Sequence, residues 1–435
     1  EYSFGKAEKV STGIKIPIIV KERTEYRLGG AANIASNVAG LSCDTALLGT
    51  CGIDDAGKMV RKICAERNIK IYGATSANTT VKQRIYVDNQ QTTRLDSEFF
   101  DKSVNESVQS TLREFRPDLI ILADYLYGAI SQSVIDNMTE YAKENNINIF
   151  FTSRNFNQFT LDKRVITVSN LFEWESCDSI RNQEQAFITM GENGVKYISE
   201  NKNVENRLYK RYPINVSGAG DTTLAVLAVM YKEDIDIEQL LLLANLMGGI
   251  AVEEELTYVL SSYDLITAVF DYLSAENNLN KILDENLSSA VIQAWRKKGY
   301  KIVFTNGCYD LLHLGHIKSF QFAREFGEKL VVAVNSDDSV RRLKGQGRPI
   351  NNLQDRTSAL AYLSMVDLVL PFEGDTAIAQ VKLVCPDVYV KGEEYKTKEL
   401  PEAEYASRVE YVPMIQGTST TAIINKISSI GDKHE

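Results

Sequence analysis

The residues with the clearest potential for chemistry lie in two short stretches that are far apart in the chain. "NGCYDLLHLGH" (306–316) holds two of the chain's three histidines, His313 and His316. "SGAGD" (217–221) places three small residues directly before Asp221. Imidazoles and backbone N–H groups at a helix start both bind anions, because the helix dipole attracts negative charge there. Both stretches therefore predict a site for phosphate groups.

The histidine pair could also bind a metal or cap a helix, and its local sequence leaves both roles open. "KIVFTNG" before it is typical of a strand and "IKSFQFAREFG" after it of a helix, so the pair lies at the start of a helix. A pair at i, i+3 could bind a metal, although no Cys, third His or acid cluster lies near it in sequence to complete the site. Either histidine could instead be an ordinary helix cap.

The small-residue turn predicts an anion hole beside a proton acceptor. Successive N–H groups of Gly218, Ala219 and Gly220 can converge on a migrating phosphoryl group. Asp221 can then accept the proton of an attacking hydroxyl, or it can merely cap the helix that follows.

A second glycine turn lies about 190 residues upstream, in "RLGGAANIASNVAGL" (27–41). Gly29 and Gly30 lead into a helix whose first turn carries Asn33, and glycine lets the backbone approach a ligand closely. By itself this stretch fits a ligand site and a tight turn before an Ala-rich helix equally well.

The elements that must position these residues alternate between strand and helix. Residues 117–125 read as a strand, 131–146 as a helix and 147–153 as the next strand, and the same alternation recurs after residue 300. This pattern predicts an α/β protein with a mostly parallel sheet in each half. We expect one α/β domain at 1–273, a linker and lead-in helix at 274–298, and a second, Rossmann-like α/β domain at 299–435.

Composition limits the possible partners. With 48 Lys and Arg against 58 Asp and Glu, the net charge is −10, so we expect small anionic ligands and no nucleic acid. The longest apolar run, at 240–252, is too short to cross a bilayer, so no membrane partner is expected. The six cysteines form no CxxC pair, which favours free thiols in a reducing cytoplasm.

The first 270 residues resemble the ribokinase, or PfkB-type, carbohydrate kinases. The resemblance rests on "LGGAAN" and "SGAGD", with "LLGTCGIDDAGK" (47–58), "SNLFEWE" (169–175), "ITMGENGV" (188–195) and "ANLMGGIAV" (244–252) in the family's order. It implies ATP-dependent, Mg²⁺-assisted phosphorylation of a sugar, with Asp221 as base. Gly29, Gly30 and Asn33 would lie on the sugar side. The implied nucleotide and metal side comprises Asn170, Glu173, Thr189, Gly191, Gly194, Gly218, Ala219, Gly220 and Asn245.

Several positions depart from the kinase pattern. The family's first strand, with its sugar-binding aspartate, has no counterpart, and since the sequence begins at Glu1 without a methionine we expect its natural start to be missing. Tyr127 replaces an expected lysine, "TSR" (152–154) replaces "DPK", and Leu256 replaces a glycine. The shortened spacing from Glu173 to Thr189 indicates either missing segments or a kinase that has changed.

Residues 299–430 resemble the nucleotidylyltransferases with an HxGH motif, supported by "AVNSDDSVRRLKGQGRPINNLQDR" (333–356), "VKGEEY" (390–395) and "GTSTTAIINKI" (417–427). The resemblance implies attack of a sugar-phosphate oxygen on the α-phosphorus of a nucleotide, with His313, His316 and Lys344 as catalytic residues. Lys344, Arg348 and Arg356 could instead be surface charges. The implied nucleotide contacts are Asn306, Gly307, Asn335, Asp337, Arg348, Lys391, Ser419, Thr420 and Thr421.

A ribokinase-like domain followed by an HxGH transferase is the arrangement of the bifunctional heptose 7-phosphate kinases and heptose 1-phosphate adenylyltransferases. This likeness implies a cytoplasmic, homodimeric enzyme of ADP-heptose synthesis, with sugar phosphates and ATP as substrates. Two alternatives remain open. The transferase could use CTP and another sugar or polyol phosphate, and the N-terminal half could be altered in substrate or be a non-catalytic binding or dimerisation module.

Overall fold

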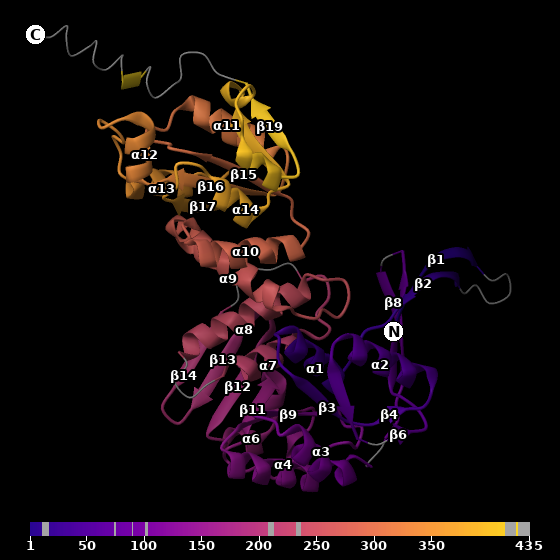
Figure 1. The fold of residues 1–435 in the computed structure, drawn as a ribbon. Coiled ribbons are helices and arrows are strands. Elements are labelled where there is room, and N and C mark those ends of the chain that lie inside the picture. Colours follow the sequence, from indigo (N-terminus) through magenta and orange to yellow (C-terminus); the bar gives the residue numbers. More distant parts are fainter. Residues whose placement is uncertain are drawn as a thin grey trace, which may run out of the picture. The chain divides into compact units, whose positions relative to one another are not determined.

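The structure, a computed structural model, describes residues 1–10, 17–73, 75–88, 90–100, 103–207, 213–231, 236–413 and 423–424 (Figure 1). The chain divides into two compact units, Glu1–Leu265 and Ile266–Glu435. The boundary that the sequence predicts, between residues 273 and 274, lies inside helix α9 (Ser262–Glu276). No helix among the described residues is both long and apolar enough to cross a membrane.

A six-stranded sheet forms the centre of the first unit, in the order β14-β13-β12-β11-β10-β9. The four strands from β9 to β12 are parallel, and β13 and β14 are antiparallel to their neighbours. The alternating pattern of the sequence thus yields the mostly parallel α/β sheet that it predicts. The strands are β9 (Leu119–Asp124), β10 (Asn148–Ser153), β11 (Ile166–Asn170), β12 (Gln185–Thr189), β13 (Val195–Ser199) and β14 (Asn203–Asn206).

Helices cover both faces of this sheet because successive strand residues point to opposite sides. Phe151 of β10 packs with α3 (Val108–Phe115), α4 (Gln132–Asn145) and α6 (Asp178–Arg181). Its neighbour Phe150 contacts Tyr231, which ends α7 (Ala219–Met230) on the other face, where α8 (Ile237–Val252) also lies (Figure 1). The sheet is therefore buried on both sides, as a parallel sheet must be.

A four-stranded sheet with the order β2-β1-β7-β8 belongs to the same unit. Its strands are β1 (Tyr2–Val10), β2 (Pro17–Glu25), β7 (Val81–Val87) and β8 (Gln90–Ser97). The remaining elements are α1 (Ala31–Gly40), α2 (Asp55–Glu66), α5 (Leu171–Ser176), the pair β3 (Thr45–Leu48) and β5 (Ile69–Tyr72), the pair β4 (Cys51–Gly52) and β6 (Thr75–Ser76), and the 3₁₀ helices η1 (Ser103–Ser107), η2 (Phe156–Gln158) and η3 (Gly191–Asn193).

The second unit is built on a parallel five-stranded sheet with the order β17-β16-β15-β18-β19. The chain moves outward from β15 in one direction and then returns to add β18 on its other side. Ligands of such sheets bind at this switch, beyond the carboxyl ends of the two central strands. The strands are β15 (Ile302–Gly307), β16 (Lys329–Asn335), β17 (Leu368–Phe372), β18 (Val388–Gly392) and β19 (Val409–Val412).

Helices also cover both faces of the second sheet. One face packs with α11 (Leu314–Arg324) and α13 (Leu353–Ala361), and the other with α10 (Glu285–Lys297) and α14 (Ile378–Val384). Trp295 of α10 is wholly buried in this second core, so the segment predicted as a linker and lead-in helix supplies part of the core. The unit also contains α12 (Asp337–Lys344) and the 3₁₀ helices η4 (Asn278–Lys281), η5 (Glu393–Tyr395) and η6 (Pro401–Tyr405).

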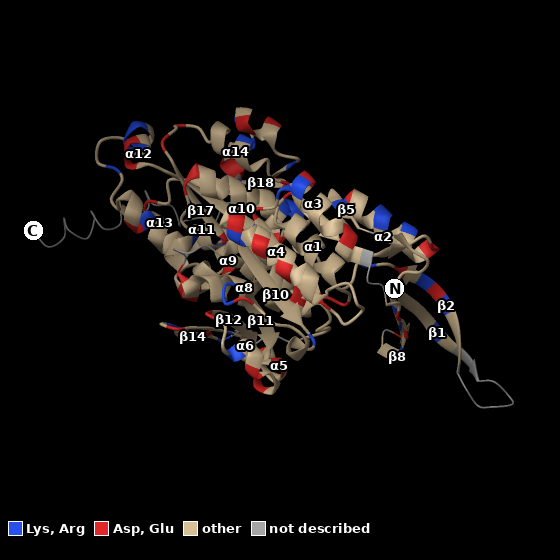
Figure 2. Ribbon diagram, turned by 90° about the horizontal axis from the view of Figure 1, so that it is seen from below, with Lys and Arg blue, Asp and Glu red and all other residues tan. Residues whose placement is uncertain are grey.

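Charges are mixed on the outer helices. Both α2 and α12 carry acidic and basic residues along the same few turns (Figure 2). This mixture fits the expectation that anionic ligands are bound by local donors rather than by a broad basic surface.

Candidate active sites

Asp221 lies in the first turn of α7 and is held by two donors from distant segments. Asn33 Nδ2 donates to its Oδ2 at 2.9 Å, and the Tyr125 hydroxyl donates to its Oδ1 at 2.6 Å. The residue that caps α7 is Gly218, not Asp221. The carboxylate therefore faces Asn33 and Tyr125 and does not cap its own helix.

The start of α1 meets the start of α7 because glycines occupy both turns. Gly30 has φ 55° and Gly218 has φ 86°, conformations that other residues rarely adopt. A Cβ on Gly218 would lie 2.9 Å from Asn33 Nδ2 and 3.0 Å from the Thr257 methyl group. A side chain at position 218 would thus displace Asn33 from Asp221.

Burial sets the protonation tendency of Asp221. Loss of solvent raises the pKa of this carboxyl, and the hydrogen bonds from Tyr125 and Asn33 and the charges of Lys82 and Arg154 only partly oppose that rise. A carboxylate with a raised pKa is a stronger proton acceptor. Tyr125 keeps its proton, because burial and the neighbouring Asp221 raise its pKa.

Asp221 opens onto a cavity of about 1030 Å³ that the sugar-side residues share. Gly29, Gly30, Asn33 and Gly218 line it, and it extends between β3 and β9 into an apolar interior. The structure thus brings together the two glycine stretches that are far apart in sequence.

The basic residues on the cavity wall include three for which the sequence predicted no role: Lys82, Arg84 and Arg154, here called the cation group. Arg84 donates to Ser217 Oγ at 3.3 Å. The Arg154 guanidinium lies 5.5 Å from the ring centre of Tyr125, and the Lys82 ammonium lies 5.6 Å from that of Tyr127. Within the described part of the chain the cation group makes no ion pair, whereas Arg94 nearby is paired with Asp96. In the sequence, a signal for the cation group was available in the spacing of Lys82 and Arg84, which lie two residues apart and therefore on one face of a strand.

The cation group is also partly desolvated. Burial, and then the charges of Arg154 and Arg94, lower the pKa of Lys82. Like charges held together in a partly buried wall favour an anionic ligand, since it would relieve their mutual repulsion.

Apart from Gly218, the residues predicted for the nucleotide side do not line this cavity. Asn170 and Glu173 form a capping box at the start of α5, with Glu173 Oε2 accepting the Asn170 N–H at 2.9 Å. Burial raises the pKa of Glu173. Thr189 pairs with Asn170 across β11 and β12, so these strand ends lie together. Of the other residues predicted for the nucleotide side, Ala219 and Gly220 begin α7, and Gly191 and Gly194 form the turn after β12.

Asn245 of α8 is engaged with the backbone of β14. Its Nδ2 donates to Asn206 O at 2.8 Å and to Asn206 Oδ1 at 2.7 Å. A Cβ on Gly194 would lie 2.1 Å from the same Asn206 carbonyl. The glycine turn, β14 and α8 are therefore packed closely at this edge of the sheet.

The positions that depart from the kinase pattern have local partners. Ser153 donates to the buried Asp124 at 2.7 Å, and Tyr127 donates to Glu98 at 2.9 Å. After Leu256, Thr257 is bonded to the Tyr2 hydroxyl through its own backbone N–H at 3.1 Å. Ser153 and Tyr127 are thus accommodated by the surrounding fold.

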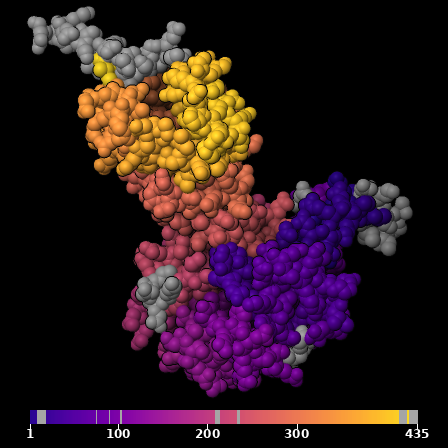
Figure 3. Space-filling view, in the orientation of Figure 1, coloured from indigo at the N-terminus to yellow at the C-terminus, as the bar shows by residue number. Residues whose placement is uncertain are grey.

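In the second unit the histidine pair begins α11. His313 is the N-cap residue, and its ring stacks on that of His316 with centres 3.9 Å apart and planes 20° apart. Tyr309 packs against His316 in an edge-to-face arrangement, with ring centres 5.2 Å apart. Neither histidine Nδ1 has a hydrogen-bond partner among the described residues. The surface of this unit is hollowed between its orange and yellow parts (Figure 3).

Both histidines favour the neutral form. Burial lowers the pKa of His313, and burial together with the neighbouring His313 lowers the pKa of His316 to about 4. A neutral imidazole carries one N–H donor, which can stabilise charge on a phosphate oxygen.

Asn306 and Lys391 lie at the ends of the two central strands, at the switch of the sheet. Lys391 Nζ donates to Asn306 Oδ1 at 3.2 Å. Burial lowers the pKa of Lys391 to about 8. Gly307 follows Asn306 and begins the loop that leads to the histidines. These predicted nucleotide contacts are therefore brought together.

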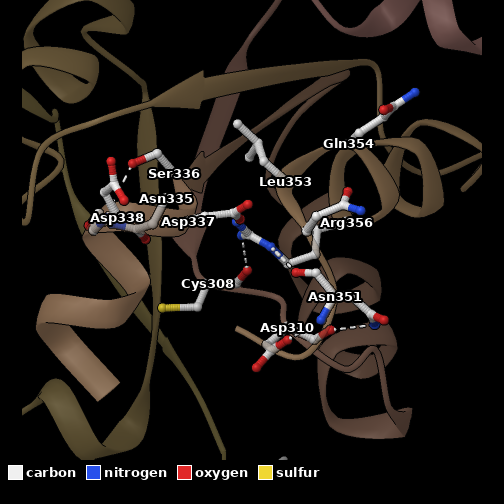
Figure 4. Close-up of polar contacts among 12 residues, drawn as sticks. Cys308, Asp310, Asn335, Ser336, Asp337, Asp338, Asn351, Leu353, Gln354 and Arg356 are labelled. Carbon is white, nitrogen blue, oxygen red and sulfur yellow. Dashed lines mark hydrogen bonds and ion pairs between the residues drawn. The ribbon is translucent and has the colours of Figure 1, made fainter. Parts of the chain in front are cut away.

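Segment 348–356 is fastened to the histidine loop by one ion pair and by hydrogen bonds. Arg348 pairs with Asp310, which also accepts the backbone N–H of Ile350 at 2.7 Å. Arg356 is wholly buried, donates to Cys308 O at 2.6 Å and pairs with Asp337 at 2.7 Å (Figure 4). The surface-charge interpretation of Arg356 is wrong, because its guanidinium ties three segments together.

The remaining predicted residues of this unit have separate positions. Lys344 is exposed at the end of α12, and its charge acts to lower the pKa of Cys308 against the larger effect of burial. Asn335 is buried and donates to Ser339 Oγ at 3.0 Å and to Gly374 O at 3.2 Å. Ser419, Thr420 and Thr421 lie outside the described residues.

No group of three His, Cys, Asp or Glu side chains arranged to hold a metal was found within the described ranges. Mg²⁺ commonly binds through one or two carboxylates together with substrate phosphates, and it does not require a cage of protein ligands. Glu173, with one carboxylate oxygen accepting the Asn170 N–H, is a residue that fits this pattern.

Two family models match the chain. Residues 10–163 and 175–262 match the pfkB family of carbohydrate kinases, and residues 304–430 match the cytidylyltransferase-like family.

Several relatives match along nearly the whole chain. The chain is 31% identical over 459 residues to the bifunctional protein HldE of Trichlorobacter lovleyi, covering 98% of this chain and 93% of that protein. It is 32% identical to the bifunctional protein HldE of Geotalea uraniireducens, with the same coverage, and 31% identical to that of Haemophilus influenzae, covering 99% of this chain and 95% of the relative.

Among solved structures, phosphofructokinase-2 from Escherichia coli matches with a TM-score of 0.46 and 14% identity, over 63% of this chain and 96% of that chain. A putative sugar kinase from Clostridium perfringens matches with a TM-score of 0.46 and 16% identity, over 61% of this chain and 91% of that chain.

Proposed function

The chain belongs to the family of bifunctional HldE proteins, in which a heptose kinase is joined to an adenylyltransferase, and we propose that its two units catalyse two steps of ADP-heptose synthesis. The first unit transfers the γ-phosphoryl group of ATP to position 1 of heptose 7-phosphate, releasing ADP. The second joins AMP from ATP to heptose 1-phosphate, releasing pyrophosphate. A separate phosphatase must remove the 7-phosphate between these steps.

The observation that carries the kinase assignment is the contact of Asp221 with Asn33 and Tyr125 beside the cation group. Asp221 takes the proton of the sugar hydroxyl as its oxygen attacks the γ-phosphorus, and the raised pKa of the carboxyl favours this role. The cation group supports a substrate that already carries a phosphate, because an uncharged sugar would leave these charges unmatched.

Mg²⁺ belongs to this proposal together with the nucleotide. Glu173 and Asn170 would hold it and the phosphates, and the bound ion would neutralise phosphate charge. The turn residues Thr189, Gly191 and Gly194, the helix start from Gly218 to Gly220, and Asn245 complete the proposed nucleotide side.

In the transferase site the histidine pair carries the assignment. An oxygen of the sugar 1-phosphate attacks the α-phosphorus in line, and pyrophosphate leaves from the opposite side. The N–H donors of His313 and His316 stabilise the charge that develops on phosphorus, while Lys344, Arg348 and Lys391 clamp the phosphates. Asn306, Gly307, Asn335 and Asp337 complete the proposed contacts among the described residues.

Two assays of the full chain test both halves. Release of ADP from ATP is measured with a panel of sugar 7-phosphates, for the wild type and Asp221→Asn. Release of pyrophosphate is measured with ATP or CTP and a panel of sugar 1-phosphates, for the wild type and His316→Ala. We expect each substitution to abolish one reaction and leave the other unchanged, so each variant is the control for the other.

Three outcomes would change the assignment. An Asp221→Asn rate equal to that of the wild type would remove the kinase role, and failure to bind any sugar phosphate would make the first unit a structural module. A preference for CTP would replace the adenylyltransferase with a cytidylyltransferase. The homodimer and the cytoplasmic location stay predictions, and sedimentation equilibrium tests the first of them.

A further inference from the structure

A buried polar network lies behind the switch of the second sheet, and two of its members, Tyr389 and Glu402, take no part in the proposed chemistry. The hydroxyl of Tyr389, a fully buried residue of β18, lies 2.6 Å from Asn306 Oδ1 and 3.1 Å from Glu402 Oε1. Glu402 comes from η6, and its relative exposure is only 6%. A buried carboxylate is costly unless it is paired, so its presence here requires a reason.

The network determines which way the Asn306 amide points. Its Oδ1 faces both the Tyr389 hydroxyl and the Lys391 ammonium. An ammonium has only donors, so a flipped amide would place its NH₂ group against another donor. With Oδ1 directed inward, the NH₂ group of Asn306 is directed away from the network, at the strand end that leads into the histidine loop.

Lys391 is held by the same network. Its ammonium lies 4.1 Å from the ring centre of Tyr395 and 5.6 Å from that of Tyr389. Glu402 on η6 and Glu394 on η5 supply the negative charges that stabilise its protonated form. The groups acting on it from the surrounding elements are Glu402, Glu394, Tyr395, Cys308, Lys398, Asn306, Tyr389 and its strand partner Tyr411.

We propose that Tyr389 and Glu402 are positioning residues of the transferase site, which hold Asn306 as a hydrogen-bond donor and Lys391 as a cation toward the triphosphate of the nucleotide. This inference rests on the proposed transferase function. Glu402 acts at a distance by keeping Lys391 charged, and Tyr389 connects the carboxylate to the amide.

The electrostatics give the proposal a distinct signature. Burial lowers the pKa of Lys391 to about 8, and the charge of Glu402 is the largest influence that opposes this shift. Replacing Glu402 by a neutral residue therefore lowers the pKa of Lys391 further, so the cation is lost nearer to neutral pH. A merely structural role for Glu402 would not move a titration.

The test uses the full chain and measures pyrophosphate release from ATP between pH 6 and 9. For Glu402→Gln we expect the alkaline limb of kcat/KM for ATP to move to lower pH by about one unit. For Tyr389→Phe we expect KM for ATP to rise about fivefold, because one hydrogen bond is lost. The alkaline limb of kcat/KM should stay close to that of the wild type. Glu404→Gln, an exposed carboxylate on the same 3₁₀ helix, is the matched control and should reproduce the wild-type profile.

Retention of the wild-type thermal transitions shows that a variant is folded, and if Glu402→Gln fails this check Tyr389→Phe carries the test. Wild-type profiles and KM values in both variants would overturn the inference while leaving the transferase in place. A wild-type chain that releases no pyrophosphate with any nucleotide would instead overturn the proposed function, and the inference with it.

Discussion

Asp221 and the histidine pair are both shifted toward their uncharged forms by burial, with different consequences. For Asp221 the shift strengthens a base, and the Tyr125 hydrogen bond limits how far it goes. For His313 and His316 the shift keeps two stacked imidazoles neutral, so that they can approach each other without repulsion. The chemistry proposed for each unit thus depends on the surrounding residues, which control whether its catalytic side chains are charged.

The Tyr125→Phe variant tests this control. Tyr125 donates to Asp221 and so stabilises its charged form, which means that losing the hydroxyl raises the pKa of Asp221 further. Because the base must be deprotonated, the acidic limb of the kinase pH–rate profile should move to higher pH. Tyr72→Phe, whose hydroxyl bonds Glu114 instead, is the control. An unmoved limb in Tyr125→Phe would show that Asp221 does not set it.

At the scale of single elements, helix starts position most of the candidate residues. α1, α7 and α11 each begin at a predicted site residue, namely Gly30, Gly218 and His313. Position 218 requires glycine for both its φ and the close contact with Asn33, whereas a Cβ on Gly220 would meet nothing within 4 Å outside its helix. The packing of the chain thus explains the glycine at 218 but not the glycine at 220.

Alanine substitutions at positions 218 and 220 test this difference between the two glycines. Gly218→Ala should destabilise the first unit by about 1–3 kcal/mol, because a positive φ and a clash with Asn33 act together. Gly220→Ala should be neutral or stabilise by up to about 1 kcal/mol, since alanine is the better helix former. Urea unfolding measures both. A loss of kinase rate in the stable Gly220→Ala would indicate close approach of the nucleotide, and equal stability of the two variants would contradict this account.

The capping box of α5 allows a similar separation. Asn170→Ala should lower the free energy of unfolding by about 1 kcal/mol through loss of the cap. Glu173→Gln keeps a side-chain acceptor for the Asn170 N–H but removes the charge, so stability should change little while the kinase KM for Mg-ATP rises. If KM is unchanged in Glu173→Gln, the pair is a helix cap and nothing more.

At the scale of the whole molecule, each of the two units has a hydrophobic core of its own. The units differ in how their buried groups respond to acid. Asp221 has a raised pKa in the first, so acid favours its folded form, while His316 has a lowered pKa in the second, so acid disfavours it.

Acid stability of the second unit should therefore depend on His316. Its pKa lies near 4 in the folded chain and near 6.5 in the unfolded chain, so between these values only the unfolded chain binds the proton. The stability that His316 contributes is complete above pH 6.5 and is lost as the pH falls toward 4. Between pH 6.5 and pH 5 the free energy of unfolding falls by about 2 kcal/mol for this reason. In calorimetry, His316→Gln should reduce the acid sensitivity of one of two transitions. Equal sensitivity in wild type and variant would contradict this shift.

Some features of the molecule follow from local sequence alone. The apolar periodicity predicts β9, α4 and β10 nearly to their ends, and it predicts that His313 lies at the start of a helix. Local patterns suffice here because helix hydrogen bonds and strand alternation connect residues that are close in sequence. The short motifs identified the kinase and transferase families for the same reason.

Other features required the tertiary structure. Asp221 meets residues that are 96 and 188 positions away, so Tyr125 could not be linked to it by spacing. The sequence left open that Arg356 is a surface charge, whereas the residue is wholly buried, and Glu402 carries no local signal of its contact with Tyr389. The sequence by itself determined the alternation of elements and the reaction classes, because those reside in contiguous residues. The tertiary structure decided which side chains hold the site residues in place and control their charge. Only the packed sheet, through the order of its strands, brings these distant side chains together.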